Sequence, residues 1–404
     1  MLFRVEIENF YSFGTQQEID LRVPKSVRDG LGRLSPTFSG SSYRAPNVVA
    51  LLGPNAAGKS TVLRAIAFAA WFATESFGHR FNRPLPYMKF GSVARNAEPT
   101  RLSFSFSGPA DFQDMSNEGP TCPYTYELVL SPRGTEPDSV IREKLSYQPG
   151  GSGKPTTIVE RLGSKQFRSA RFFMTVHQDR ALKEVLRSNA SAICTLAQLN
   201  HEISATFVKW ISCNATNMSI DRTENDEGGA VQWYASNIDA FSQLQRIVKR
   251  IDLGIEQIEL DVSSSKPQLR FHHPGLDCGL PLELESHGTR QLIKLLPLIQ
   301  SALKTGGVAV IDDMDSVVHP MLLPEIMRWF GDEELNPRGA QLWTTCHATS
   351  LLMELTMDEV MFCSKNSNGQ STVFKLADVK GVRRTKNLFG KYMGGEYGAV
   401  PTIG

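Results

Sequence analysis

The stretch VVALLGPNAAGKSTVLRAIAFAAWFA, residues 48–73, decides the fold. Its first five residues are all apolar and predict a buried strand. Residues 53–60, GPNAAGKS, fit the pattern G-x-x-x-x-G-K-[ST] of a phosphate-binding loop (P-loop). The apolar residues after the loop recur at helical spacing, so we expect a helix that begins near Lys59. Because strand, loop and helix follow one another in the order that this pattern requires, nucleotide binding is favoured over a plain glycine-containing turn.

The residue types in this loop match the chemistry of a bound triphosphate. Gly53 and Gly58 let the backbone curl so that successive N–H groups point at the phosphates. The start of the helix adds its partial positive charge. We expect Lys59 to reach the β- and γ-phosphates and the Ser60 hydroxyl to ligate Mg²⁺. The predicted nucleotide-binding residues are Gly53, Pro54, Asn55, Ala56, Ala57, Gly58, Lys59, Ser60 and Thr61.

The composition bounds the class of protein. With 404 residues, the chain exceeds one typical domain, and its net charge of +1 gives no overall basic field for nucleic acid. The six cysteines are scattered, with no C-x-x-C pair and no metal-ligand spacing, which fits a reducing compartment. No apolar run is long enough to span a membrane, and the N-terminus alternates like a strand rather than a signal peptide. We expect a soluble cytoplasmic protein with no membrane partner.

Three parts follow from the distribution of these patterns. Residues 1–175 are expected to form an N-terminal lobe that holds the P-loop and an antiparallel β section, since several stretches after residue 100 alternate polar and apolar. Residues 176–255 show helical spacing and are expected to form a helical insertion or lid, interrupted by a polar surface loop over 214–229. Residues 256–404 return to alternating strands and helices and form the C-terminal lobe. The predicted fold class is therefore α/β, with a mixed sheet.

A second apolar strand, over residues 307–311, ends in two acids. Such an ending is the Walker B pattern. It is a much stronger indication of a nucleotide site when a P-loop precedes it in the chain. Asp312 is placed to hold Mg²⁺ through its water shell. Asp313, next in the chain, is placed to orient and activate the attacking water.

Two further positions have a functional and a structural interpretation. His347 follows a strand over 341–345, where it can hydrogen-bond the γ-phosphate and the water; alone it would be an ordinary loop histidine, and its place after Walker B favours the functional role. Ser286-His287-Gly288-Thr289 opens a helix, so the Ser286 hydroxyl and the free N–H groups can bind an anion. Since Lys59 serves the chain's own nucleotide, this second site suggests contact with a neighbour's γ-phosphate. The alternative is a plain N-cap in which Ser286 satisfies Thr289.

In this order the motifs resemble the ABC-type AAA ATPases of the SMC, RecF and OLD superfamily, and within it the compact RloA-like group that accompanies bacterial phage-defence systems. The resemblance spans almost the whole chain. It rests on NFYSF (9–13), GPNAAGKST (53–61), ELESHGTR (283–290), VIDDMDSVVHP (310–320), TTCHATSLL (344–352) and YGAVPTIG (397–404).

The resemblance implies an ABC-type ATPase head that uses ATP and Mg²⁺. It makes Ser286 and Gly288 the signature that acts on another protomer, Asp315 a D-loop residue and His347 the switch histidine. Three positions depart from the family pattern: Tyr11 stands where Arg is usual, His287 replaces a small residue, and Asp313 replaces the catalytic Glu. The last substitution predicts slow hydrolysis. The Q-loop glutamine is unassigned, although Gln198 lies in a similar segment.

The sequence therefore predicts an ATPase whose two heads enclose ATP at composite sites. The resemblance further implies a homo-oligomeric sensor or scaffold that controls a separate effector, often a Toprim-type nuclease. The alternative is a DNA-binding repair ATPase of the RecF type. Its DNA contact would use the basic residues Arg246, Lys249, Arg250, Arg383, Arg384 and Lys386. A third alternative is a slow nucleotide switch with a purely structural role.

Overall fold

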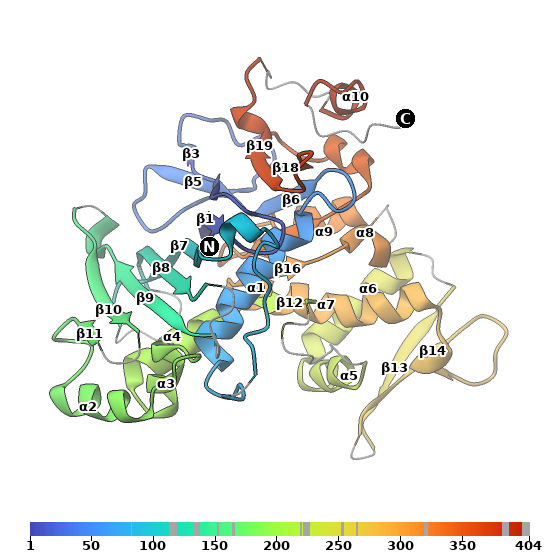
Figure 1. The fold of residues 1–404 in the computed structure, drawn as a ribbon. Helices are drawn as coiled ribbons and strands as arrows, with labels where there is room; N and C mark the ends of the chain where they lie inside the picture. The colour runs from blue at the N-terminus through green and yellow to red at the C-terminus, as the bar shows by residue number, and fades with distance from the viewer. Residues whose placement is uncertain are drawn as a thin grey trace.

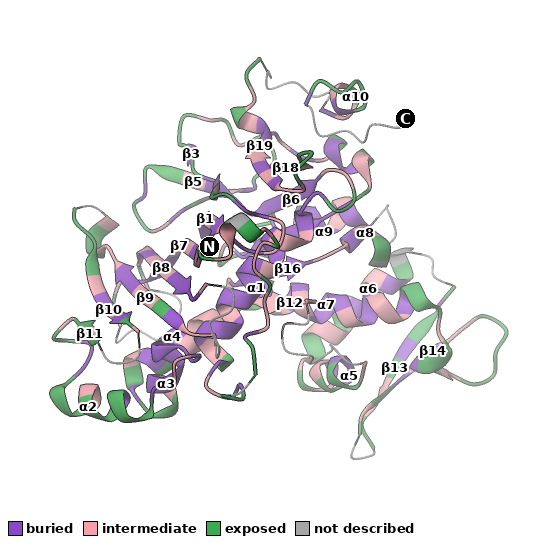
Figure 2. Cartoon of the chain, in the orientation of Figure 1, coloured by how far each residue is buried: buried purple, intermediate pink, exposed green. Residues whose placement is uncertain are grey.

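The computed structural model describes residues 1–81, 83–112, 119–132, 138–151, 153–163, 166–218, 220, 227–251, 254–263, 266–318, 322–381 and 388–397. Two large sheets organise these residues, and the helix that follows the P-loop, α1 (Lys59–Glu75), contacts both the parallel strands and the helices beside the antiparallel sheet (Figure 1). The buried residues along α1 form the purple band at the centre of Figure 2.

The parallel sheet carries the P-loop strand at its centre. Its strand order is β12-β16-β17-β6-β18-β19, and only the β18–β19 pair is antiparallel. Strands β6, β16 and β17 are buried at every residue, as expected for apolar runs covered on both faces. The strands are β6 (Val48–Leu52), β12 (Ala215–Thr216), β16 (Val308–Ile311), β17 (Gln341–Thr345), β18 (Val360–Lys365) and β19 (Ser371–Lys375).

The second sheet is antiparallel, with strand order β11-β10-β9-β8-β7-β1-β2. In β1 and β8, buried residues alternate with partly exposed ones because one face of the sheet packs on the core. They are β1 (Leu2–Glu8), β2 (Gln17–Asp20), β7 (Thr100–Pro109), β8 (Thr121–Leu130), β9 (Val140–Tyr147), β10 (Thr156–Leu162) and β11 (Gln166–Ser169). The predicted α/β fold with a mixed sheet and an antiparallel section is confirmed.

Two small sheets complete the β structure. One has the order β3-β5-β4 and the other β13-β14-β15. Figure 1 shows β13 and β14 projecting from the body beside α6. The strands are β3 (Val23–Pro24), β4 (Leu34–Pro36), β5 (Tyr43–Pro46), β13 (Gln257–Asp261), β14 (Gln268–His272) and β15 (Leu280–Pro281).

The helices of the 176–255 segment pack into two different cores. Those before residue 212 bury apolar side chains against α1 and the antiparallel sheet, whereas α5 and α6 pack with α7 in the other core. The three-part division of the chain stays a prediction. The helices are α2 (Val176–Val185), α3 (Ala192–Gln198), α4 (Glu202–Ile211), α5 (Glu227–Ser236), α6 (Ile238–Ile251), α7 (His287–Thr305), α8 (Met314–Val317), α9 (Leu323–Trp329) and α10 (Leu388–Met393). None of the helices in the described ranges has the length and apolar character to cross a membrane.

The prediction of a polar loop over residues 214–229 is wrong at both ends of that range. Ala215 and Thr216 form the edge strand β12, which pairs in parallel with Ala309 and Val310, and α5 begins at Glu227. A two-residue strand has no periodicity that a sequence pattern can reveal. Residues 221–226, which carry most of the acids that suggested a loop, lie outside the described residues.

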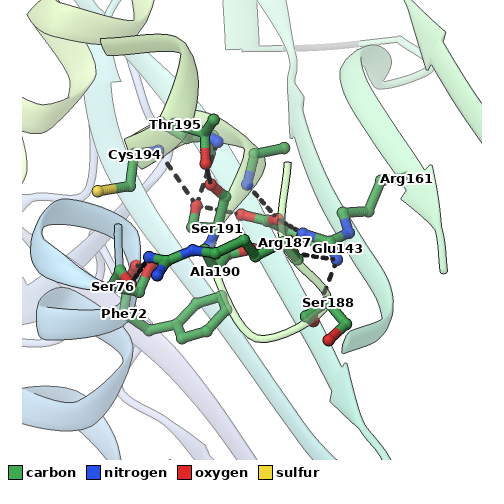
Figure 3. Close-up of polar contacts among 12 residues, drawn as sticks. Phe72, Ser76, Glu143, Arg161, Arg187, Ser188, Ala190, Ser191, Cys194 and Thr195 are labelled. Carbon is green, nitrogen blue, oxygen red and sulfur yellow. Dashed lines mark hydrogen bonds and ion pairs between the residues drawn. The ribbon is translucent and has the colours of Figure 1, made fainter. Parts of the chain in front are cut away.

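A buried polar network ties the end of α1 to the antiparallel sheet (Figure 3). The Glu143 carboxylate on β9 accepts hydrogen bonds from the hydroxyls of Tyr126, at 2.9 Å, and Ser191, at 2.5 Å. The Arg161 guanidinium on β10 lies 3.8 Å from that carboxylate, and both side chains are at most 1% exposed. The Ser191 amide donates to Ser76 Oγ, just beyond α1, at 2.8 Å. The helix that begins at the P-loop is therefore fixed at its far end by a paired, hydrogen-bonded charge.

Candidate functional site

The loop between β6 and α1 adopts a curled backbone. Gly53, Ala56 and Gly58 have positive φ angles of 138°, 60° and 103°. A Cβ on Gly53 would lie 2.2 Å from the carbonyl oxygen of Cys363, and one on Gly58 would lie 2.7 Å from Ser371 Oγ. Both glycines are therefore required by conformation and by space, as the sequence pattern predicted.

The start of α1 is open to an anion. Gly58 is its N-cap residue, no side chain caps the first turn, and that turn contains no acidic residue. The free N–H groups at a helix start carry partial positive charge. This arrangement fits phosphate oxygens.

Lys59 lies at the base of the loop. It is only 5% exposed, and its Nζ donates to the carbonyl oxygens of Gly53 at 2.9 Å and Pro54 at 3.0 Å. Burial lowers the pKa of its ammonium group, while nearby acidic groups, including Asp313 and Asp312, act in the opposite direction. The structure thus brings the cation of the P-loop near the acids of the Walker B strand.

The two acids after β16 are held by residues that the sequence analysis missed. Asp312 Oδ1 accepts from the Thr345 hydroxyl at 2.6 Å, and the Asp313 amide donates to Thr345 Oγ1 at 2.8 Å. Asn217 accepts from the Asp312 amide at 2.8 Å and donates to the Asp312 carbonyl at 2.9 Å. Asn217 follows the short strand β12, so the sequence offered no pattern that connects it to Asp312.

Asp313 and His347 form a pair. Asp313 Oδ1 lies 3.2 Å from His347 Nε2, and the two side chains are 50% and 45% exposed. Both line the same cavity as the P-loop. A carboxylate next to an imidazole, open to a cavity, can orient a water molecule and receive its proton.

Asp315 fixes the backbone that carries His347. Its Oδ2 accepts from the amides of His347 at 2.7 Å and Ala348 at 2.6 Å. The same side chain has a buried Oδ1 with no hydrogen-bond partner among the described residues. Within the chain, Asp315 is therefore a positioning residue for the histidine loop, and its predicted role at the nucleotide stays a prediction.

A cavity of about 930 Å³ lies over the P-loop. It brings residues 55–61 together with Asp313 and His347, which are distant in the sequence. The remaining lining residues are Tyr11, Ser12, Tyr87, Met88, Lys89, Phe90, Gly91, Asp138, Lys365, Asn368 and Gly369. Its size is within the range of small-molecule sites. Asp312, Asp315, Gly53 and Pro54 shape the surroundings without lining it.

Magnesium fits the oxygen donors present at this site. Ser60 supplies a hydroxyl and Asp312 a carboxylate, both hard ligands that Mg²⁺ prefers. Within the described ranges, no three His, Cys, Asp or Glu side chains gather to hold a metal by themselves. A magnesium ion here would therefore share its coordination between these two side chains, phosphate oxygens and water.

The predicted signature residues lie elsewhere. Ser286, His287 and Gly288 are exposed at the start of α7 and do not line the cavity. Ser286 Oγ accepts from the Thr289 amide at 3.2 Å, so the N-cap of the structural interpretation is present. A Cβ on Gly288 would meet no atom closer than 4.0 Å, which leaves this corner open to another molecule.

Other predicted positions have distinct surroundings. Tyr11 lines the cavity, and the Arg64 guanidinium lies 5.0 Å from the centre of the Tyr11 ring. An arginine therefore lies beside the position at which the family named in the sequence analysis usually has arginine. Gln198 is exposed at the end of α3 and does not line the cavity. Of the basic residues proposed for DNA, Arg246 and Lys249 are exposed on α6. Residues 319–320, 383, 384, 386 and 398–404 lie outside the described part of the chain, as does the side chain of Arg250.

The chain is similar to one family of sequences and to several solved structures. Curated protein sequences include none that matches it. Among solved structures, it is similar to an SMC head domain from Thermotoga maritima, with 16% identity, a TM-score of 0.38, and 93% of this chain and 98% of that chain covered. It is also similar to an SMC head bound to the C-terminal winged-helix domain of ScpA, with 10% identity, a TM-score of 0.42, and coverage of 92% and 97%.

A third similar structure is an Smc head with an extended coiled coil, bound to the C-terminal domain of ScpA, from Pyrococcus furiosus. It has 10% identity, a TM-score of 0.39, and coverage of 93% and 96%. The sequence profile described as "AAA domain, putative AbiEii toxin, Type IV TA system" matches residues 48–352, well over half of the chain. The match begins at the P-loop strand and extends past Asp312, Asp313 and His347. The chain therefore belongs to this family of AAA domains.

Proposed function

We propose that this chain binds ATP with Mg²⁺ in the cavity over the P-loop and hydrolyses it slowly. The observation that carries the proposal is the convergence of the P-loop, Asp313 and His347 on one cavity. A phosphate cradle alone would support binding, whereas the carboxylate–imidazole pair adds the groups that act on water.

Each residue has a role in this proposal. The loop N–H groups and Lys59 hold the β- and γ-phosphates, and Ser60 and Asp312 hold the metal. Magnesium, when bound, neutralises charge on the phosphate oxygens. Asp313 orients the water and accepts its proton, and His347 hydrogen-bonds the γ-phosphate. Asp315, Thr345 and Asn217 keep these groups in place through the contacts described above.

We propose that a second copy of the chain completes the site. Residues 286–288 are exposed at the start of α7, where helix N–H groups are suited to an anion, yet they do not line the chain's own cavity. In a two-fold assembly, Ser286 and Gly288 of each copy close over the γ-phosphate held by the other. Such an interface uses the same surface on both copies.

We propose further that the nucleotide state of this assembly controls a separate effector in defence against phage. A Toprim-type nuclease is the kind of effector that the sequence resemblance implies. The description of the family, which refers to a toxin–antitoxin system, fits a chain that acts together with a second protein. Slow hydrolysis suits such a sensor, because an ATP-bound state then persists until it is disturbed.

The experiment that tests the composite site mixes two inactive variants. Lys59→Ala removes the ammonium group that contacts the phosphates and should abolish ATP binding. Ser286→Arg should leave ATP binding intact and stop hydrolysis. In a mixed dimer, one site carries both changes and the other carries neither. An equal mixture should therefore regain roughly a quarter of the parent's ATPase rate if copies pair at random.

Glu283→Arg is the matched control, because it adds the same side chain to an exposed position three residues before Ser286. It should hydrolyse ATP like the parent. A mixture that recovers no activity, although Ser286→Arg still binds ATP, would refute the composite site and leave ATP binding untouched.

A further inference from the structure

A second cavity, of about 570 Å³, lies at the surface of the molecule between α5, α6, α7 and α9. It has no lining residue in common with the cavity over the P-loop. Nothing in the proposed ATPase mechanism uses it. Its volume is within the range that small-molecule ligands occupy.

Two tryptophans form part of its wall. Trp233 and Trp329 are half-buried and line the cavity from α5 and α9. The Trp233 ring is held edge-on against the buried Tyr234, with 5.4 Å between the ring centres. Ile247 and Leu303 add apolar surface. Indole rings in a wall of this kind offer flat faces on which a planar ring can stack.

Two cations lie at the same cavity. Arg246 lines it from α6 and Lys304 from α7, against a single acid, Asp239. Within the described part of the chain, the Arg246 guanidinium makes no ion pair or hydrogen bond, and Lys304 Nζ donates to Asn237 Oδ1 at 3.1 Å. The lining thus carries a net positive charge, and Arg246 presents a fork of donors that matches phosphate.

Gln300 provides a third, independent observation. Its side chain lines the cavity and is 7% exposed. Its Nε2 donates to the Ala240 carbonyl at 3.3 Å and to Gln243 Oε1 at 3.0 Å, which fixes the amide orientation. Its Oε1 is buried with no hydrogen-bond partner among the described residues. Because a buried acceptor without a partner is unfavourable, a ligand N–H group that reaches this oxygen gains a hydrogen bond.

We propose that this cavity is a second ligand site, which takes a nucleotide-class molecule. The indole rings stack on its heteroaromatic base, Arg246 and Lys304 contact its phosphate, and Gln300 Oε1 accepts from an N–H group of the base. A single phosphate suffices, since the lining of the cavity includes no curled glycine loop to hold a triphosphate. The site is therefore distinct from the P-loop in the ligand that it prefers.

The test uses nucleoside monophosphates on the full chain, because these ligands lack the β- and γ-phosphates that the P-loop would hold. AMP, GMP, CMP and UMP are each titrated by equilibrium dialysis, with inorganic phosphate as a separate arm. At least one nucleotide should bind at one site per chain, equally well in the parent and in Lys59→Ala. Tryptophan fluorescence should change over the same concentration range, because Trp233 and Trp329 contact the base.

Arg246→Ala should weaken that binding at least tenfold, and Gln300→Met should weaken it while keeping the volume of the side chain. Lys249→Ala is the matched control, since it removes an exposed cation from the same helix at a position that does not line the cavity. It should bind like the parent.

Three results would overturn the proposal. One is that no monophosphate binds at millimolar concentration. Another is that binding disappears in Lys59→Ala, which would assign it to the P-loop. The third is that the base or the cation plays no part, which would be seen as inorganic phosphate binding as tightly as the nucleotides or as Arg246→Ala binding like the parent.

Discussion

At Asp313 the backbone lies in the left-handed region, with φ 49° and ψ 48°. Asp and Asn adopt this conformation at low cost, whereas longer side chains do so less readily. Asp313→Asn is therefore a substitution that removes the carboxylate and keeps the local backbone. It should bind ATP like the parent and hydrolyse it on the order of a hundredfold more slowly or worse, because the proton acceptor is lost. Single-turnover hydrolysis measures the effect.

The Asp313→Glu variant distinguishes the effect of the length of the acidic side chain from that of the left-handed backbone. Its carboxylate extends one methylene further, and a misplacement of about 1 Å can cost on the order of a hundredfold in rate. We expect faster hydrolysis than in the parent. An Asp313→Asn enzyme as fast as the parent would remove this residue from the mechanism. A slower Asp313→Glu enzyme would mean that the left-handed backbone, rather than the length of the acid, sets the geometry.

Residues of the site were predictable where a local pattern contains them. Lys59 lies in a loop of characteristic sequence that follows one apolar run, and Asp312 directly follows another. Asn217 and Thr345 were not predictable, because their roles depend on β12 and β17 lying on either side of β16. An Asn in a polar stretch has the same sequence surroundings whether it faces solvent or holds an aspartate.

Within α7, Pro297 interrupts the hydrogen-bond ladder of the helix. Proline has no N–H group, so the carbonyl of Ile293, four residues earlier, loses its usual donor. The Tyr234 hydroxyl, from α5, donates to that carbonyl at 3.3 Å. The tyrosine is fully buried, and burial raises the pKa of its hydroxyl well above the usual value, so it stays a donor.

Tyr234→Phe keeps the ring and leaves the Ile293 carbonyl without a partner. The chain should lose about 1–3 kcal/mol of unfolding free energy, the cost of a buried polar group that is left unsatisfied. Urea unfolding measures this loss. Tyr43→Phe serves as control, since Tyr43 is 45% exposed, and its change should stay within about 0.5 kcal/mol. Equal effects in the two variants would show that the contact to α7 contributes nothing.

Long elements with clear periodicity were predicted well. The helix that Ser286 opens appears as α7, and part of the helical spacing over residues 176–255 appears as α6. Their packing was not predictable. The pattern that marks a helix gives its buried face but not the element that covers it. It therefore did not predict that neighbouring helices of the 176–255 segment lie in two different cores.

For the whole molecule, His273 links stability to pH. Its Nδ1 lies 2.8 Å from the Gly254 carbonyl oxygen and its Nε2 lies 2.7 Å from Glu285 Oε1, so the charged ring can donate to both acceptors. The hydrogen bond to Glu285 is the main cause that raises the pKa of His273. Its contribution is fully present below the pKa of about 6.5 for an unfolded histidine, and is lost as the pH rises through the higher value of the folded state.

His273→Ala should therefore destabilise the chain most at acidic pH, and the difference from the parent should shrink as the pH rises above neutrality. Urea midpoints at several pH values from 5.5 upward test this. His177→Ala, at an exposed position on α2, should show no such trend. A difference that is constant over the whole range would contradict a charged His273.

The whole chain should also not cleave nucleic acid by itself. The proposed role assigns cleavage to a separate effector, so the purified chain with ATP and Mg²⁺ should cut neither DNA nor RNA. Gel assays at long incubation times measure this, with Lys59→Ala and Asp313→Asn beside the parent. Cleavage that survives rigorous purification and changes in these variants would contradict the assignment.

The strand order of the parallel sheet has a consequence for synthesis on the ribosome. Strand β6, at residues 48–52, pairs with β17 at 341–345 and with β18 at 360–365. The P-loop strand therefore has no neighbour in its sheet until most of the chain has emerged. Strands β1, β2 and β7 to β11, all before residue 170, can already pair with one another. Contacts of such long sequence separation form slowly and leave apolar strands exposed meanwhile. A nascent chain thus carries an unpaired, wholly apolar β6 for most of its translation, and ribosomes stalled before residue 341 would present it to chaperones or proteases.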